Sequence, residues 1–166
     1  IIQMINHGIT SGALFMLVGF LYDRRHTRRI SDFGGIKKSM PLYAAIFLFT
    51  SFASIGLPGL NGFVGEFMIL MGSFPTFQIL SSVAAFGVVL AAIYMLWAYQ
   101  RIFNGQLNND ENAVLSDLNP KEIIAVGPLL VLMLFIGIYP SFIEGYVVQD
   151  VSVIFETINI YTEVSK

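Results

Sequence analysis

The stretch "GLPGLNGFVGEFMIL", residues 56–70, joins a cluster of helix-breaking residues to the one acid of a long apolar segment. Between Ser39 and Gln100, Glu66 is the only Asp, Glu, Lys, Arg or His side chain. Proline cannot donate a backbone hydrogen bond, and glycine weakens a helix by roughly 1 kcal/mol relative to alanine. The stretch therefore predicts an apolar helix that is interrupted at residues 58–62, by Pro58, Gly59, Asn61 and Gly62, and that carries an acid about one turn later.

The composition defines the class of fold. Of the 166 residues, 55% are hydrophobic and 12% are charged, whereas a soluble domain carries roughly 25% charged residues. Three stretches, Ile1–Tyr22, Ser39–Gln100 (apart from its one acid) and Ile123–Ile143, reach the ~18–20 apolar residues that a helix needs to cross a bilayer. The sequence predicts an all-α, polytopic helical membrane protein.

Several classes of function find no support in the sequence. The absence of cysteine excludes disulfides and thiolate metal or iron–sulfur sites, and a net charge of −2 argues against a nucleic-acid partner. We recognise no Gly-rich nucleotide loop, no metal-ligand cluster and no nucleophile–base pair. The chain opens in apolar sequence without an initiator Met or a basic signal-peptide region. We expect a fragment, or a chain that begins within a larger assembly, with no cofactor or metal of its own.

The same reading gives an expected topology of four spans within residues 1–145. The spans are expected at about residues 1–22, 41–78 (broken at 58–62), 81–103 and 123–144, followed by an amphipathic tail over 146–166. Three short spans within 41–103 are the alternative. The loop Asp23–Met40 carries six of the nine basic residues, and the positive-inside rule favours placing it on the same side as the loop Asn104–Glu122. For both loops to lie on the same side, an even number of crossings must separate them, which requires residues 41–78 to form a single broken crossing.

Two titratable residues inside spans are candidates for proton transfer. An ionised carboxylate near the bilayer centre costs ~2.5–3.5 kcal/mol on insertion scales, and intramembrane acids are functional by default. Glu66 follows a helix break of the kind that builds ion sites in transporters. His7 lies ~15 residues from the expected interface at Tyr22, on the order of 22 Å along a helix, and imidazole can exchange protons at physiological pH. The alternative for both is a packing role, through hydrogen bonds to neighbouring helices.

Two motifs resemble one family. The stretches "MINHGITSGALFMLVGFLYDRRHTRRISDFGGI" and "GLPGLNGFVGEFMILMGSF" are similar to the C-terminal third of chain M (subunit 4 in mitochondria), an antiporter-like subunit of the proton-pumping NADH:quinone oxidoreductase, respiratory complex I. The resemblance covers nearly the whole chain. It implies a proton-translocating membrane subunit, which works through a relay of buried titratable residues coupled to quinone reduction elsewhere. NADH, FMN, iron–sulfur clusters and quinone are then expected in other subunits.

The resemblance also implies roles for residues and partners. Glu66, in "GEF", falls at the titratable site on the family's broken span, where the sister subunits usually carry Lys, and His7, in "NHG", falls at a histidine on the central hydrophilic axis. Expected partners are other membrane subunits of the complex, including sister antiporter-like subunits, together with the lipid bilayer and protons. The expected location is a bacterial inner membrane, or a mitochondrial inner or thylakoid membrane.

The family's other titratable residues lie upstream of Ile1, so this stretch alone is not expected to be a complete translocase. Two other readings stay open. One is a subunit of a multisubunit sodium/proton antiporter or of a membrane-bound hydrogenase, and the other is a non-catalytic membrane scaffold.

Overall fold

The computed structural model describes the backbone of residues 1–107 and 109–164, and all of their side chains except those of 149–150 and 155–164. The elements are α1 (Ile2–Arg25), η1 (Ile30–Asp32), η2 (Ile36–Lys38), α2 (Pro41–Ser54), α3 (Asn61–Ser73), α4 (Gln78–Phe103), α5 (Asp110–Ala113), α6 (Pro120–Ile138) and α7 (Ser141–Val164). The described part of the chain contains no strand, so the all-helical prediction is confirmed. Helices α1, α4 and α6 are each long and apolar enough to span a membrane, and α2 is a shorter apolar helix. The protein is a polytopic helical membrane protein.

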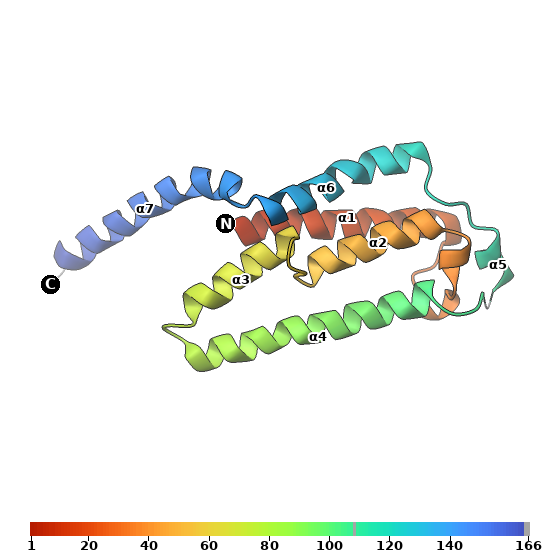
Figure 1. Ribbon diagram of the computed structural model, residues 1–166, viewed down its shortest axis with the longest axis horizontal. Helices are drawn as coiled ribbons and strands as arrows, with labels where there is room; N and C mark the ends of the chain where they lie inside the picture. Colours follow the sequence, from red (N-terminus) through yellow and green to blue (C-terminus); the bar gives the residue numbers. More distant parts are fainter. Residues whose placement is uncertain (108, 165–166) are drawn as a thin grey trace.

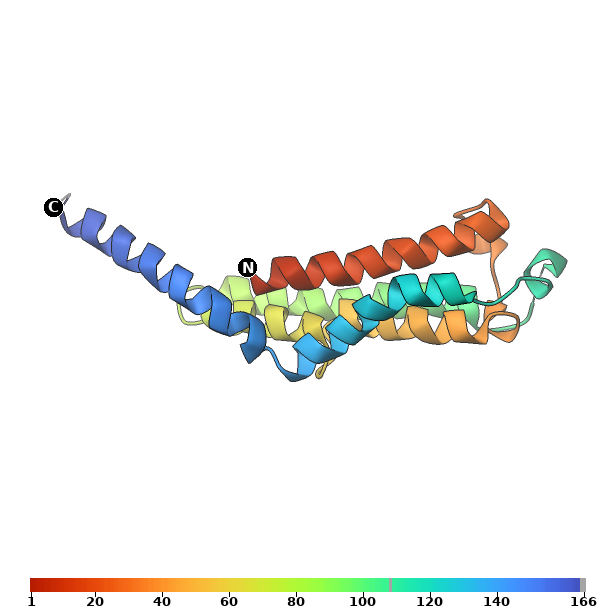
Figure 2. The same cartoon turned by 90° about the horizontal axis from the view of Figure 1, so that it is seen from above.

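The helices form a bundle in which α2 and α3 follow one another in the same direction (Figures 1 and 2). The pair runs antiparallel to α1 and α4, and together the two short helices extend about as far as α4 (Figure 1). Helix α1 packs against α2, α3 and α6, and α3 also packs against α6. Helix α7 leaves the bundle at the end opposite the long loops (Figure 1). The broken segment is thus one discontinuous crossing.

The break lies at residues 55–60, slightly earlier than expected. Gly56 and Gly59 adopt φ angles of 74° and 93°, a left-handed conformation that costs other residues about 1–2 kcal/mol. Pro58 and Gly59 lie in the break, but Asn61 and Gly62, expected within it, form the first turn of α3. The first turn of a helix tolerates helix-breaking residues, because its N–H groups have no intrahelical partner to lose.

The other boundaries also differ from the expected spans. Helix α3 ends at Ser73 and α4 begins at Gln78, while α6 runs over Pro120–Ile138 and stops before Tyr139-Pro140. A proline disfavours helical conformation in the residue before it, which explains that stop. Residues 141–144, expected in the last span, open α7. The amphipathic character of 146–166 stays a prediction, because most side chains of that segment lie outside the described residues.

The two long loops lie at the same end of the bundle, called here the loop end (Figure 1). The Gly35 N–H donates to the Asn104 carbonyl at 3.0 Å, which joins the loops through their backbones. Asn112 joins them through its side chain, because it accepts from Arg25 Nε at 2.9 Å and donates to the Asp32 carbonyl at 3.1 Å. The basic loop and the second loop therefore share a side, as the charge distribution indicated.

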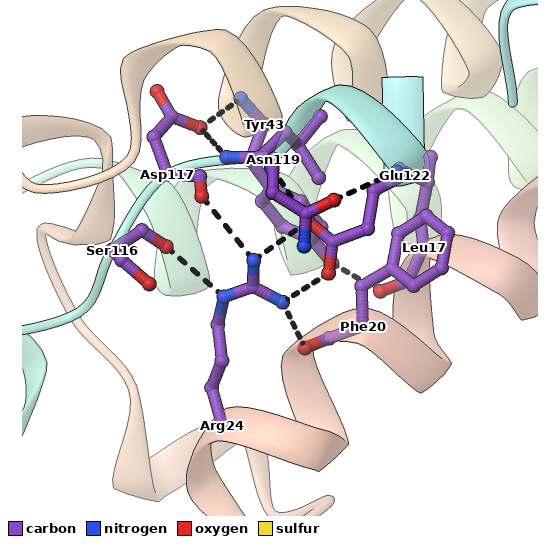
Figure 3. A network of polar contacts seen from close by, with 9 residues as sticks. Leu17, Phe20, Arg24, Tyr43, Ser116, Asp117, Asn119 and Glu122 are labelled. Carbon is purple, nitrogen blue, oxygen red and sulfur yellow. Dashed lines mark hydrogen bonds and ion pairs between the residues drawn. The ribbon is translucent and has the colours of Figure 1, made fainter. Parts of the chain in front are cut away.

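A polar clasp made by Arg24, Asp117, Asn119 and Glu122 fastens three helices at the loop end (Figure 3). Arg24, in the last turn of α1, donates from Nη1 and Nη2 to the two Glu122 oxygens at 2.6 and 2.7 Å. The same guanidinium donates to the carbonyls of Phe20, Ser116 and Asp117 at 2.9, 3.0 and 3.2 Å. All five N–H groups of an arginine suit such a set of acceptors, so the end of α1 is fixed to the start of α6.

The clasp extends to α2 through two N-terminal caps. The Asp117 carboxylate accepts from the backbone N–H groups of Leu42 and Tyr43 at 2.8 and 2.9 Å, which caps α2. Asn119 and Glu122 form a capping box at the start of α6. The clasp therefore fixes where the first half of the broken crossing begins.

Candidate functional site

Glu66 lies in the second turn of α3, with its carboxylate against the break. A Cβ placed on Gly56 would lie 2.6 Å from Glu66 Oε2, so the carboxylate occupies the space that this glycine leaves free. The half-buried Glu66 also lines a cleft of about 260 Å³ between α3 and α4. The other lining residues are Ile69, Leu70, Ala84, Gly87, Val88 and Ala91. The site is therefore one carboxylate at the edge of an apolar cleft, next to irregular backbone.

The break itself is packed by protein on two sides. Gly62 meets the Ala53 carbonyl so closely that no Cβ would fit between them, and Gly137 of α6 lies in the same way against Gly59 and Leu60. Within the break, the Leu57 N–H donates to the Phe52 carbonyl at 3.0 Å and the Leu60 N–H to the Leu57 carbonyl at 3.1 Å. Non-helical backbone at membrane depth requires such partners, so the break is an ordered feature next to the acid.

His7 lies on an exposed face of α1, away from the packed core. Its nearest polar partner is the Ser11 hydroxyl one turn later, 3.2 Å from Nδ1 and 3.3 Å from Nε2. Among the contacts of the described residues, none joins His7 to Glu66. The structure therefore does not bring the two sequence-predicted groups into direct contact, and a proton passing between them needs intermediate carriers.

A buried polar cluster, not identified from the sequence, joins the two helices that carry these groups. We call Asn6, Thr10 and Asn61 the amide cluster. Asn6 Nδ2 donates to the Asn61 carbonyl at 2.7 Å, and Asn61 Nδ2 donates to the Asn6 carbonyl at 3.2 Å. The Thr10 hydroxyl lies 3.3 Å from Asn61 Nδ2 and 3.4 Å from Asn61 Oδ1. The available signal was an asparagine within each of two apolar helices, since such residues bond across helices in membranes.

Two acceptors beside the amide cluster have no partner in the described part of the chain. They are Gln3 Oε1 and Asn6 Oδ1, both buried. Gln3 lies directly against Gly65, the residue before the acid. Buried acceptors are normally hydrogen-bonded, so each of these two oxygens has capacity for a further hydrogen bond. No group of three or more His, Cys, Asp or Glu residues that could hold a metal occurs among the described residues.

These features define an integral membrane protein with a discontinuous helix and an acid at its break. Residues 1–93 match the model of the family described as "NADH:quinone oxidoreductase/Mrp antiporter, TM". The chain belongs to this family, and the resemblance noted in the sequence is confirmed.

Individual relatives agree with this assignment. The chain is 43% identical over 152 residues to NADH-quinone oxidoreductase subunit M of Rhodobacter capsulatus, covering 92% of this chain and 30% of that protein. It is 42% identical over 141 residues to NADH-ubiquinone oxidoreductase chain 4 of Arabidopsis thaliana, covering 85% and 28%. A solved structure, respiratory complex I from Thermus thermophilus with bound NADH, contains a chain that matches with a TM-score of 0.77 at 33% identity, covering 84% of this chain and 29% of that one. The chain thus spans about 30% of the length of the curated relatives it matches.

Proposed function

We propose that the chain is part of a proton-translocating, antiporter-like membrane subunit of a complex I-type NADH:quinone oxidoreductase. Support comes from the relatives, which are named as subunits of that enzyme over 85–92% of this chain. In this proposal the chain contributes to translocation and holds no redox group, while NADH, FMN, iron–sulfur clusters and quinone act in other subunits. Its partners are those membrane subunits, sister antiporter-like subunits among them, and the lipids around them.

The observation that carries the proposal is the position of Glu66 beside the helix break. An anionic carboxylate in an apolar cleft is costly, so the site favours a bound proton or a neighbouring cation. The non-helical backbone of the break lies next to the carboxylate, as at the ion sites that discontinuous helices build in transporters. An acid in this position can take up a proton from one side and release it when the surrounding charge or hydration changes.

His7 is proposed as the second proton carrier of this segment. Its ring faces away from the core of this chain and contacts the Ser11 hydroxyl, which can both donate and accept a hydrogen bond. Since no direct contact joins His7 to Glu66, water or side chains of the remaining subunit would carry the proton between them. The helix break, with Pro58 and Gly59 inside it and Asn61 and Gly62 at its edge, holds Glu66 in place.

Glu66→Gln in the complete complex tests this function. Inverted membrane vesicles report NADH oxidation by absorbance and proton uptake by a pH-sensitive dye. Glutamine keeps the shape and polarity of the side chain but cannot release a proton, so we expect at least a tenfold loss of proton uptake, while Glu66→Asp retains part of it. Asp110→Asn, an exposed acid in the loop at the start of α5, serves as the control and should retain full uptake. Full proton uptake in the assembled Glu66→Gln complex would refute the proposal.

A multisubunit cation/proton antiporter is the second candidate, because the matching family description includes Mrp antiporters. The same vesicles separate the two functions. Respiration-driven proton uptake without added sodium supports the complex I assignment, whereas proton movement that requires a sodium gradient supports the antiporter.

A further inference from the structure

We propose that the amide cluster of Asn6, Thr10 and Asn61 is a positioning device, which sets the directions in which His7 and Glu66 point. This inference rests on the proposed function. The cluster lies between α1 and the first turn of α3, and its three side chains are 1%, 4% and 0% exposed. The cluster therefore connects α1 and α3, the helices that carry His7 and Glu66, where they contact one another.

The hydrogen bonds of the cluster are reciprocal. Each asparagine donates its side-chain amide to the backbone carbonyl of the other, at 2.7 and 3.2 Å. Apolar side chains tolerate sliding and rotation of one helix against another, whereas the two reciprocal amide–carbonyl bonds can form together in one register only. Specifying register is the best-attested role of buried polar groups between helices.

The register determines where both titratable side chains face. An α-helix turns by about 100° per residue, so Asn6 and Thr10 lie on one face of α1 while His7 points about 100° away from Asn6. On α3, Glu66 follows Asn61 by five residues and therefore points about 140° away from it. With Asn61 directed at α1, the carboxylate is directed at Gly56 and at the cleft between α3 and α4, where the structure places it.

A small loss of register would be enough to disturb proton transfer. A side-chain atom lies about 5–6 Å from the helix axis, so a 20° rotation of α3 would move the Glu66 carboxylate by about 2 Å. Proton transfer requires a heavy-atom distance of about 2.6–3.2 Å, and a displacement of this size breaks such a contact. The break makes α3 sensitive to this rotation, because no continuous helix connects it to α2.

Variants in the complete complex test the device, with protons translocated per NADH oxidised as the readout. Thr10→Val removes the hydroxyl at nearly constant volume and Asn61→Ala removes most of the cluster, whereas Thr10→Ser keeps the hydroxyl. We expect the ratio to fall at least twofold in Thr10→Val and further in Asn61→Ala, and to be retained in Thr10→Ser. Ser51→Ala is the matched control, because Ser51 is equally buried near the break but its hydroxyl donates within its own helix, to the Phe47 carbonyl. A purely structural role would reduce the amount of assembled complex without changing the ratio.

The outcomes separate this inference from the proposed function. If Glu66→Gln abolishes translocation while Thr10→Val and Asn61→Ala keep the full ratio, the positioning device is refuted and the proposed function stands. If Glu66→Gln keeps full translocation, the proposed function is refuted as well. If Asn61→Ala does not assemble, Asn6→Leu decides, because that variant removes one of the two amide–carbonyl bonds and leaves the bond from Asn61 Nδ2 to the backbone carbonyl of residue 6 in place. A full ratio in Asn6→Leu would then refute the device.

Discussion

Replacing Gly56 by alanine should displace the acid of the site without changing the acid itself. A Cβ at this position would lie 2.6 Å from Glu66 Oε2. Ordinary contact begins at 3.4 Å, so the carboxylate must move by about 0.8 Å to avoid repulsion. Because a misplacement of about 1 Å can cost roughly 100-fold in a positioned reaction, we expect proton translocation per NADH to fall at least fivefold in Gly56→Ala.

Gly59→Ala provides the matched control for backbone strain. Both glycines lie in the break with positive φ angles, 74° and 93°, so alanine costs about 1–2 kcal/mol of strain at either position. A Cβ on Gly59 meets no atom within 4 Å. Both variants should therefore lose similar stability, and only Gly56→Ala should lose coupling.

The assay is the ratio of protons taken up to NADH oxidised in inverted vesicles, normalised to assembled complex on native gels. Equal ratios in the two variants, with equal amounts of complex, would refute the reasoning, because the contact between Gly56 and Glu66 would then have no functional consequence.

Three further predictions concern the packing around the site and the loop end. Arg24→Gln should lower the free energy of unfolding by about 2–3 kcal/mol, because it leaves a carboxylate that is 13% exposed without its charged partner. Glu122→Gln in the same chain should recover part of this loss in a double-mutant cycle followed by denaturant unfolding. Gly137→Ala should lower the yield of assembled complex on native gels, because a Cβ there would overlap the break, whereas Gly127→Ala, with nothing within 4 Å, should be neutral. A hydrogen bond from the Thr27 hydroxyl, at 2.5 Å, lowers the pKa of Asp32 below its usual value. The stabilisation of the first loop by this bond should therefore be complete above about pH 4 and be lost as the pH falls further. The check is the hydrogen-exchange protection of the loop amides, with rates corrected for the intrinsic pH dependence of exchange, which should fall on acidification in the parent chain and stay constant in Asp32→Asn.

The position of the acid relative to the break was predictable, but its surroundings were not. The spacing from Pro58 and Gly59 to Glu66 placed the carboxylate about one turn into a new helix, because helix breakers act locally. The contact with Gly56 depends on a positive φ angle and on how the break lies against the first turns of α3. Neither is encoded by the spacing alone.

The amide cluster illustrates the same limit. The sequence predicts Asn61 within the break because asparagine is a poor helix former, whereas in the structure it begins α3 and binds α1. Its partner Asn6 lies 55 residues away in the chain. A single sequence gives no register between helices, so the pairing could not be derived.

By itself, the sequence determined that this chain is a helical membrane protein with one interrupted crossing and an acid beside it. Apolar length, charge distribution and breaker residues act within a few turns of helix, and these properties can be read along the chain. Only the tertiary structure decided that Asn6, Thr10 and Asn61 meet, that Arg24 fastens α1 to α6, and that no direct contact joins His7 to Glu66. Those facts depend on the rotation and register of whole helices, which packing between distant segments fixes.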